Sequence, residues 1–193
     1  MKRKPFYIIT LKGIGYIILG NAMCLFMTMA LAMFGSNWFT NILSILFSSF
    51  IFFSLAFTVA WKDGTAERSM LKLGRIEGIK KYRWIWAGLI MYAAAAAPTV
   101  VLLLNKLFFP EQDLLLAYRL VSGSALPFLL TFVEPVVTET EAWVQTTLRQ
   151  IDNMPVIFPV LMLVYYALIP AATQLGYWCG VNDKLNTEKI MYK

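Results

Sequence analysis

Residues 41–61 read NILSILFSSFIFFSLAFTVAW, a run of 21 positions without one charged side chain. A helix of about 20 apolar residues is long enough to cross the roughly 30 Å of hydrocarbon in a bilayer. The run therefore predicts a transmembrane helix.

The composition of the whole chain agrees with this interpretation. Of the 193 residues, 59% are hydrophobic and 15% are charged, and the mean hydropathy is +0.64. A soluble domain carries about 25% charged residues, so this chain has too few polar groups to cover a water-facing surface. The expected fold class is all-α, a polytopic membrane helical bundle whose main solvent is lipid.

Three further apolar stretches have the length of a span, and each is bounded by aromatic or charged residues. We expect one integral membrane domain over residues 1–193. Its predicted spans are Ile14–Phe34, Asn41–Trp61, Trp84–Leu104 and Val156–Val181.

A fifth stretch, Leu114–Val133, is long enough to cross but contains Arg119, Gly123 and Pro127. It is either a re-entrant or interfacial helix bent at Gly123 and Pro127, or a fifth span. Lysine and arginine concentrate on the cytoplasmic side of membrane proteins. With four crossings, 14 of these residues lie inside and three outside, whereas five crossings give 12 and five. Four spans in the cytoplasmic membrane, with both termini inside, are therefore favoured.

The segment that follows predicts a short helix on the outer leaflet, near residues 139–152. Thr138 and Glu141 have the spacing of a capping box. Apolar residues then recur on one helical side, which is typical of an amphipathic interfacial helix. The residues of that face are Trp143, Val144, Leu148 and Ile151.

The densest block of charge is Lys62–Arg83, with seven basic and three acidic residues. We interpret it as a cytoplasmic loop in which Asp63-Gly64 turns the chain out of the membrane and Thr65 caps a short helix. Basic groups near a membrane surface are attracted to anionic lipids of the inner leaflet. The block serves orientation and lipid contact alone, or it also docks a cytoplasmic partner. The residues expected at headgroups or at a partner are Arg68, Lys72, Arg75, in one stripe, and Lys80, Lys81 and Arg83.

Polar residues inside spans have two interpretations. Hydroxyls at i and i+4, such as Ser44 and Ser48, usually bond to the helix backbone or join helices. Polar and charged groups at depth can instead line a ligand site or a cavity, and the candidates are Arg119, Asn21 and Gln174.

Small and proline residues in the spans also have a structural and a functional interpretation. Gly88 and the run Ala93–Ala97 predict a packing seam or, alternatively, the wall of a pathway. Pro98, Pro159 and Pro170 are expected to loosen their helices.

Catalysis is not expected. The chain has no histidine, and the four predicted spans contain no carboxylate, so groups for proton relay or zinc binding are missing. Asp63-Gly64 and Arg68 partly match the signature of enzymes that transfer phosphoalcohols from CDP-linked donors. Lys81 and Ile85 occupy its last two aspartate positions, so the metal-binding carboxylates are lost. We expect no cofactor, no metal and no nucleic-acid partner.

Three segments resemble a group of small, functionally uncharacterised multipass proteins of Gram-positive bacteria. They are Asp63 to Arg75, Lys80 to Gly88, and the ending from Leu175-Gly176-Tyr177 to Lys189-Ile190-Met191-Tyr192-Lys193. The resemblance implies a location in the cytoplasmic membrane and no activity.

The leading hypothesis is a non-enzymatic accessory subunit of a larger membrane assembly of the transport type. Its expected partners are a bilayer with an anionic inner leaflet and other membrane protein subunits. The alternatives are a self-contained small transporter or channel and a lipid-modifying membrane enzyme.

Overall fold

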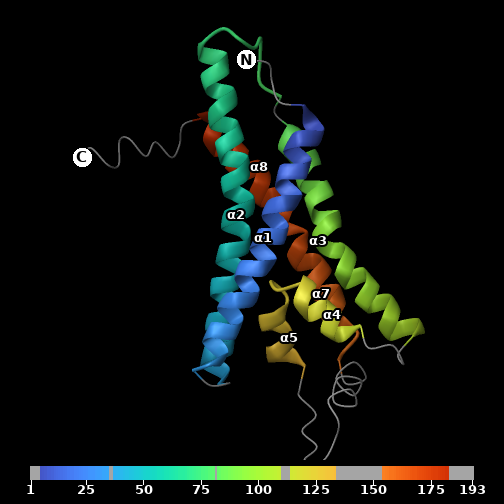
Figure 1. The fold of residues 1–193 in the computed structure, drawn as a ribbon. Coiled ribbons are helices and arrows are strands. Elements are labelled where there is room, and N and C mark those ends of the chain that lie inside the picture. The colour runs from blue at the N-terminus through green and yellow to red at the C-terminus, as the bar shows by residue number, and fades with distance from the viewer. Residues whose placement is uncertain (1–4, 35–36, 81, 110–113, 134–153, 183–193) are drawn as a thin grey trace, which may run out of the picture. The chain divides into compact units, whose positions relative to one another are not determined.

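The chain is helical throughout most of the computed structural model, which describes residues 5–34, 37–80, 82–109, 114–133 and 154–182 (Figure 1). Within these ranges there is no β-strand, so the expected all-α class is confirmed. The predicted helix near residues 139–152, with Trp143, Val144, Leu148 and Ile151, lies outside the described residues.

Four helical stretches of the described chain are long and apolar enough to cross a membrane. Each overlaps one predicted span, so a helix of sufficient length and apolarity is confirmed at all four places. Two helix ends differ clearly from the prediction: the first helix begins at Phe6 instead of Ile14, and the second ends at Lys72 instead of Trp61. A hydropathy pattern marks only the apolar part of a helix, whereas the helix itself continues into polar sequence. The stretches are α1 (Phe6–Ala32), α2 (Trp38–Lys72), α3 (Arg83–Phe108), and α7 (Ile157–Tyr166) followed by α8 (Leu168–Asn182).

The fifth stretch is divided into two helices of seven residues each, α4 (Leu115–Val121) and α5 (Leu126–Phe132). Seven residues of α-helix rise about 10 Å, so neither can cross the hydrocarbon. Between them the amide of Ala125 donates to the carbonyl of Ser122 at 2.9 Å and closes a turn. Pro127 stands in the first turn of α5, where a missing N–H costs nothing. The predicted interruption around Gly123 and Pro127 is confirmed.

The three span prolines behave differently from one another. Pro98 lies inside α3, which continues through it. Pro159 falls in the first turn of α7, so it starts that helix and the expectation that it loosens the span is wrong. Pro170 follows the break at Ala167 between α7 and α8. Since a proline cannot donate to the carbonyl four residues before it, Pro170 leaves Tyr166, the last residue of α7, without that helical bond.

Contacts within the chain gather into two compact units, each built from segments far apart in sequence. Unit 1 comprises residues 1–17, 53–92 and 168–193, and unit 2 comprises residues 18–52 and 93–167. α1, α2 and α3 contribute to both units, whereas α4, α5 and α7 belong to unit 2 and α8 to unit 1.

In unit 2, α1 and α2 lie side by side and antiparallel, and small polar side chains join them (Figure 1). The hydroxyl of Thr28 is 3.4 Å from those of Ser44 and Ser48. The thiol of Cys24 donates to the carbonyl of Ser48 at 3.2 Å. The hydroxyl of Thr28 also donates to the carbonyl of Cys24 at 2.8 Å. These side chains therefore bond to the helix backbone and to each other, as the i, i+4 pattern predicts.

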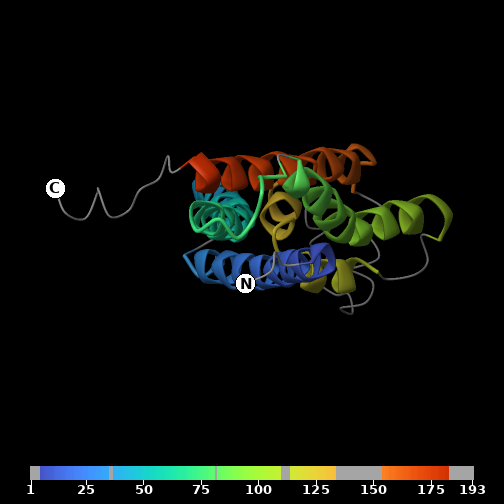
Figure 2. The same ribbon diagram turned by 90° about the horizontal axis from the view of Figure 1, so that it is seen from above.

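In unit 1, α8 lies next to α2 (Figure 2), and glycines let it approach its neighbours to backbone distance. A Cβ at Gly176 would overlap the carbonyl of Phe57, and one at Gly180 would overlap that of Trp61. A Cβ at Gly88 of α3 would meet Thr173 and Pro170 of α8. The packing role predicted for Gly88 is therefore confirmed, and α8 is fixed against α2 and α3 by contacts that no larger residue permits.

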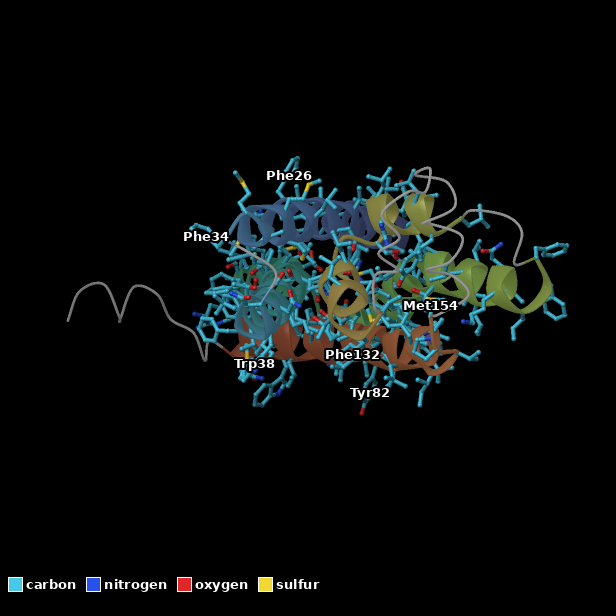
Figure 3. The ribbon with its side chains drawn as sticks, turned by 90° about the horizontal axis from the view of Figure 1, so that it is seen from below. Phe26, Phe34, Trp38, Tyr82, Phe132 and Met154 are labelled. Carbon is cyan, nitrogen blue, oxygen red and sulfur yellow. The ribbon has the colours of Figure 1, made fainter. Side chains whose placement is uncertain are left out.

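Most of each span faces outward. Only 22% to 39% of the residues in the apolar part of each span are buried in the chain itself. Phe26, Phe34 and Trp38 illustrate this, since all three side chains point away from the ribbon (Figure 3). Such surfaces require lipid or another apolar partner, which makes this an integral membrane protein.

Candidate functional site

The charged block Lys62–Arg83 is built differently from the prediction. α2 does not end at Trp61 but continues for three further turns to Lys72. Asp63 and Gly64 are helical, so they make no turn out of the membrane. The hydroxyl of Thr65 donates to the carbonyl of Trp61 at 3.0 Å, within the same helix, and does not cap a new one. Residues 62–72, which we call the α2 extension, therefore form a rigid rod of about 16 Å.

The packing of α8 explains why the helix continues through Asp63-Gly64. A Cβ at Gly64 would lie 2.5 Å from the carbonyl oxygen of Tyr177. In return, a Cβ at Gly180 would meet the amide of Thr65 at 2.9 Å. A glycine on each helix thus permits close contact, and tertiary packing outweighs the low helix propensity of glycine.

A buried ion pair fixes the next turn of the α2 extension. Glu67 and Arg83 form a direct hydrogen-bonded salt bridge, and their exposed fractions are only 3% and 9%. The hydroxyl of Tyr177, on α8, donates to the other carboxylate oxygen of Glu67 at 2.8 Å. Three segments therefore meet at one carboxylate: the α2 extension, the first residue of α3, and α8.

Asp63 makes the second buried contact, one turn earlier on the same face. Its carboxylate accepts a hydrogen bond from the indole N–H of Trp84 at 3.1 Å. Trp84 is 1% exposed and Asp63 is 9% exposed. A small cavity of about 60 Å³ lies beside this pair, and Lys12 of α1 also lines it. Both carboxylates of the extension are thus held by donors from the start of α3.

The buried charges of this cluster are stable only because they have hydrogen-bond partners within the chain. Transfer of a charge from water into a protein interior costs several kcal/mol, and only a well-formed partner set offsets this. Glu67 has its two oxygens bonded to Arg83 and Tyr177. Removal of one partner would leave a charge in the protein interior without a group that solvates it. The cluster therefore holds the α2 extension in one position.

The opposite face of the extension is basic and exposed. Lys62 and Lys72 are exposed on α2, and Arg75 and Lys80 are exposed in the segment that follows. The chain reverses just after the helix at Gly74, whose φ of +66° is a conformation that favours glycine. Since α2 ends at Lys72, Arg75 is not on the helix, and the predicted stripe of Arg68, Lys72 and Arg75 is interrupted.

The residues predicted to contact headgroups or a partner differ in their exposure. Lys72, Arg75 and Lys80 are exposed and Arg68 is half-buried. Arg83 is buried against Glu67, so its placement at the headgroups is wrong. Lys81 lies outside the described residues.

The three predicted cavity residues belong to different environments. In unit 2, the side-chain oxygen of Asn21 accepts hydrogen bonds from the amide of Ser124 at 3.1 Å and from its hydroxyl at 2.7 Å. The hydroxyl of Ser124 is also 3.1 Å from that of Tyr166. Asn21 therefore fixes the turn between α4 and α5 to α1.

Arg119 is half-buried in the last turn of α4. Asp113 and Glu134, the acidic residues that flank this stretch in the sequence, lie outside the described residues. Its neighbour Tyr118 is fully packed, with its hydroxyl 3.2 Å from that of Thr99. Tyr118 therefore serves as a hydrogen-bonding group between α4 and α3.

Gln174 is in unit 1, where it lines a groove of about 500 Å³ together with Tyr177 and Trp178. The predicted cavity residue Gln174 therefore lies at an opening in the described structure. The remaining residues of that groove are Ile79, Tyr82, Val181 and Asn182.

A lipid-modifying enzyme would gather Asp63, Glu67 and Glu77 around a metal ion, and the described residues do not form this arrangement. Asp63 and Glu67 are bonded to Trp84, Arg83 and Tyr177, while Glu77 is exposed. Within the described part of the chain, no three acidic, cysteine or histidine side chains are grouped so as to hold a metal ion.

Comparison of the chain with protein-family models, with curated proteins and with solved structures finds no match. The resemblance to multipass proteins of Gram-positive bacteria stays a prediction.

Proposed function

We propose that this chain is a non-enzymatic accessory subunit of a larger assembly in the cytoplasmic membrane, of the transport type. The observation that supports the proposal best is the two-sided α2 extension. Its acidic face is closed, because Asp63 and Glu67 are bonded within the chain. Its other face presents Lys62 and Lys72 on a rigid helix. Such a surface is better suited to docking an acidic partner than to catalysis.

The outward faces of the spans support the same proposal. Large side chains such as Phe26 and Phe50 are more than 70% exposed. Close packing between membrane helices, not hydrophobicity alone, drives their association, and these faces are free to pack against the helices of another subunit. A self-contained channel has less support, since Asn21, Ser124 and Tyr166 bond to one another.

Both termini and the α2 extension belong inside the cell in this proposal, because most of the lysine and arginine lies there. Single cysteines at Ser69, which is exposed on α2, and at Thr146 test the orientation. A membrane-impermeant thiol reagent added to intact cells should modify only the cysteine at position 146, in a background without Cys24 and Cys179. Modification at position 69 would reverse the orientation.

Purification in mild detergent tests the subunit role. We expect a defined protein partner in fixed stoichiometry, identified by mass spectrometry, and its loss on Lys72→Glu with Arg75→Glu. Lys12→Glu is the control, because Lys12 is an exposed cation on α1. Recovery of the chain alone, or equal loss in both variants, would contradict the proposal.

A further inference from the structure

The groove beside Gln174 is amphipathic. Ile79 and Val181 line it with aliphatic surface, and Gln174 and Asn182 line it with amide groups. Its rim includes Trp178 and Tyr82, which are 45% and 67% exposed. Figure 3 shows Tyr82 projecting outward from the ribbon. Tryptophan and tyrosine favour the membrane–water boundary, where one part of the ring is apolar and the other is hydrated, so the lining has the character of that boundary.

The exposed charges of the segment that leads up to the groove residues are almost all positive. Two groove residues, Ile79 and Tyr82, belong to the segment that contains Lys80 and follows Arg75. Of the acidic groups in this block, Glu67 is paired with Arg83, and Asp63 is buried and bonded to Trp84. Of the exposed charges described between residues 62 and 80, four are cations and one is an anion. These are Lys62, Lys72, Arg75 and Lys80, with Glu77.

From these two features we infer that the groove is a binding site for an anionic phospholipid. An acyl chain lies along Ile79, Trp178 and Val181, while the phosphate lies toward Lys80 and Arg75. A basic pocket beside a membrane helix binds phosphate headgroups in this way. The inference goes beyond the subunit role. It shares with that role only the assumption that the groove residues, within 79–82 and 174–182, lie at a lipid surface.

A charge variant tests the headgroup contact. The purified chain in detergent is titrated with phosphatidylglycerol and, separately, with phosphatidylcholine, and lipid retention is measured by native mass spectrometry. We expect preference for phosphatidylglycerol. Lys80→Gln should weaken its retention roughly fivefold, the factor that corresponds to one basic group near the surface. Lys12→Gln, which removes an exposed cation that does not line this groove, should change retention less than twofold.

A shape variant tests the acyl contact. Trp178→Ala removes one wall of the groove and should lower retention of both lipids. Trp86→Ala is matched to it, because Trp86 is 64% exposed in unit 1 and is not among the groove residues. Tyr82→Ala provides a second wall variant, and each variant is used only if its helical circular dichroism and elution match those of the unchanged chain.

Three results would overturn the site. The first is equal retention of the two lipids by the unchanged chain, and the second is equal effects of Trp178→Ala and Trp86→Ala. If Trp178→Ala releases a co-purifying protein and leaves lipid retention intact, the groove binds protein and the inference is wrong. A chain that purifies alone and still selects phosphatidylglycerol would remove the subunit proposal and leave the lipid site standing.

Discussion

The two units of this chain use opposite kinds of polar contact. Unit 1 is held by ionised side chains, with Glu67 and Arg83 bonded directly and Tyr177 completing the carboxylate. The hydrogen bonds described above for unit 2 join neutral groups, such as Thr28 with Ser48 and Asn21 with Ser124. Buried ions demand a full set of partners, whereas neutral hydroxyls can return to their own helix backbone. The loss of one group should therefore cost far more in unit 1 than in unit 2.

The largest effect is expected for Glu67→Ala. It leaves Arg83 buried without its carboxylate, so the free energy of unfolding should fall by about 3–5 kcal/mol. The double variant Glu67→Leu with Arg83→Leu removes both charges and should be destabilised less than the single variant. Reversible unfolding in mixed micelles measures both. A double variant worse than Glu67→Ala would show that the ion pair does not act as a unit.

Tyr177→Phe should have the next largest effect. It removes one hydrogen bond to a charged group and no buried volume, which costs about 1.5–3 kcal/mol. The control is Tyr82→Phe, because Tyr82 is 67% exposed and should lose less than about 0.5 kcal/mol. Equal losses in the same unfolding assay would mean that the contact with Glu67 contributes nothing special.

Gly180→Ala and Gly15→Ala form a pair that tests backbone contact. A Cβ at Gly180 would overlap the carbonyl of Trp61, while one at Gly15 meets nothing within 4 Å. We expect Gly180→Ala to cost about 1–3 kcal/mol through overpacking. Gly15→Ala should be neutral or stabilising by up to about 1 kcal/mol, because alanine favours the helix. Melting temperatures in one detergent decide between these outcomes, and a tolerated Gly180→Ala would contradict the contact.

The smallest effect belongs to unit 2. Ser124→Ala removes a hydroxyl that bonds to Asn21 and Tyr166, and the amide of residue 124 still reaches Asn21. A neutral contact of this kind contributes about 1 kcal/mol. Ser69→Ala, on the exposed face of α2, is the comparison. A loss as large as that of Glu67→Ala would erase the difference between the units.

The sequence predicted what depends on local hydropathy. The apolar run at residues 41–61 and the residues Gly123 and Pro127 were enough to place a span and an interrupted helix, because each signal lies within the element that it describes. The hydroxyl contacts of Ser44 and Ser48 followed from their spacing for the same reason.

The cluster around Glu67 could not be predicted in this way. Its members are separated by up to 110 positions, and a run of charge beside a span resembles a solvated loop. Gly176 and Gly180, four residues apart on α8, were the one signal of close packing near Asp63-Gly64. Without the partner helix, that spacing could not identify which backbone it meets.

The contact of Tyr177 with Glu67 also sets an order of assembly during synthesis. Arg83 follows Glu67 by 16 residues, so the ion pair can form as soon as the third span leaves the ribosome. Tyr177 emerges 94 residues after Arg83, a delay of roughly 5–20 s at ordinary elongation rates. During that interval the carboxylate lacks one hydrogen-bond donor, and the nascent chain presents a hairpin with an incompletely hydrogen-bonded ion pair to the insertion and quality-control machinery until its last helix arrives.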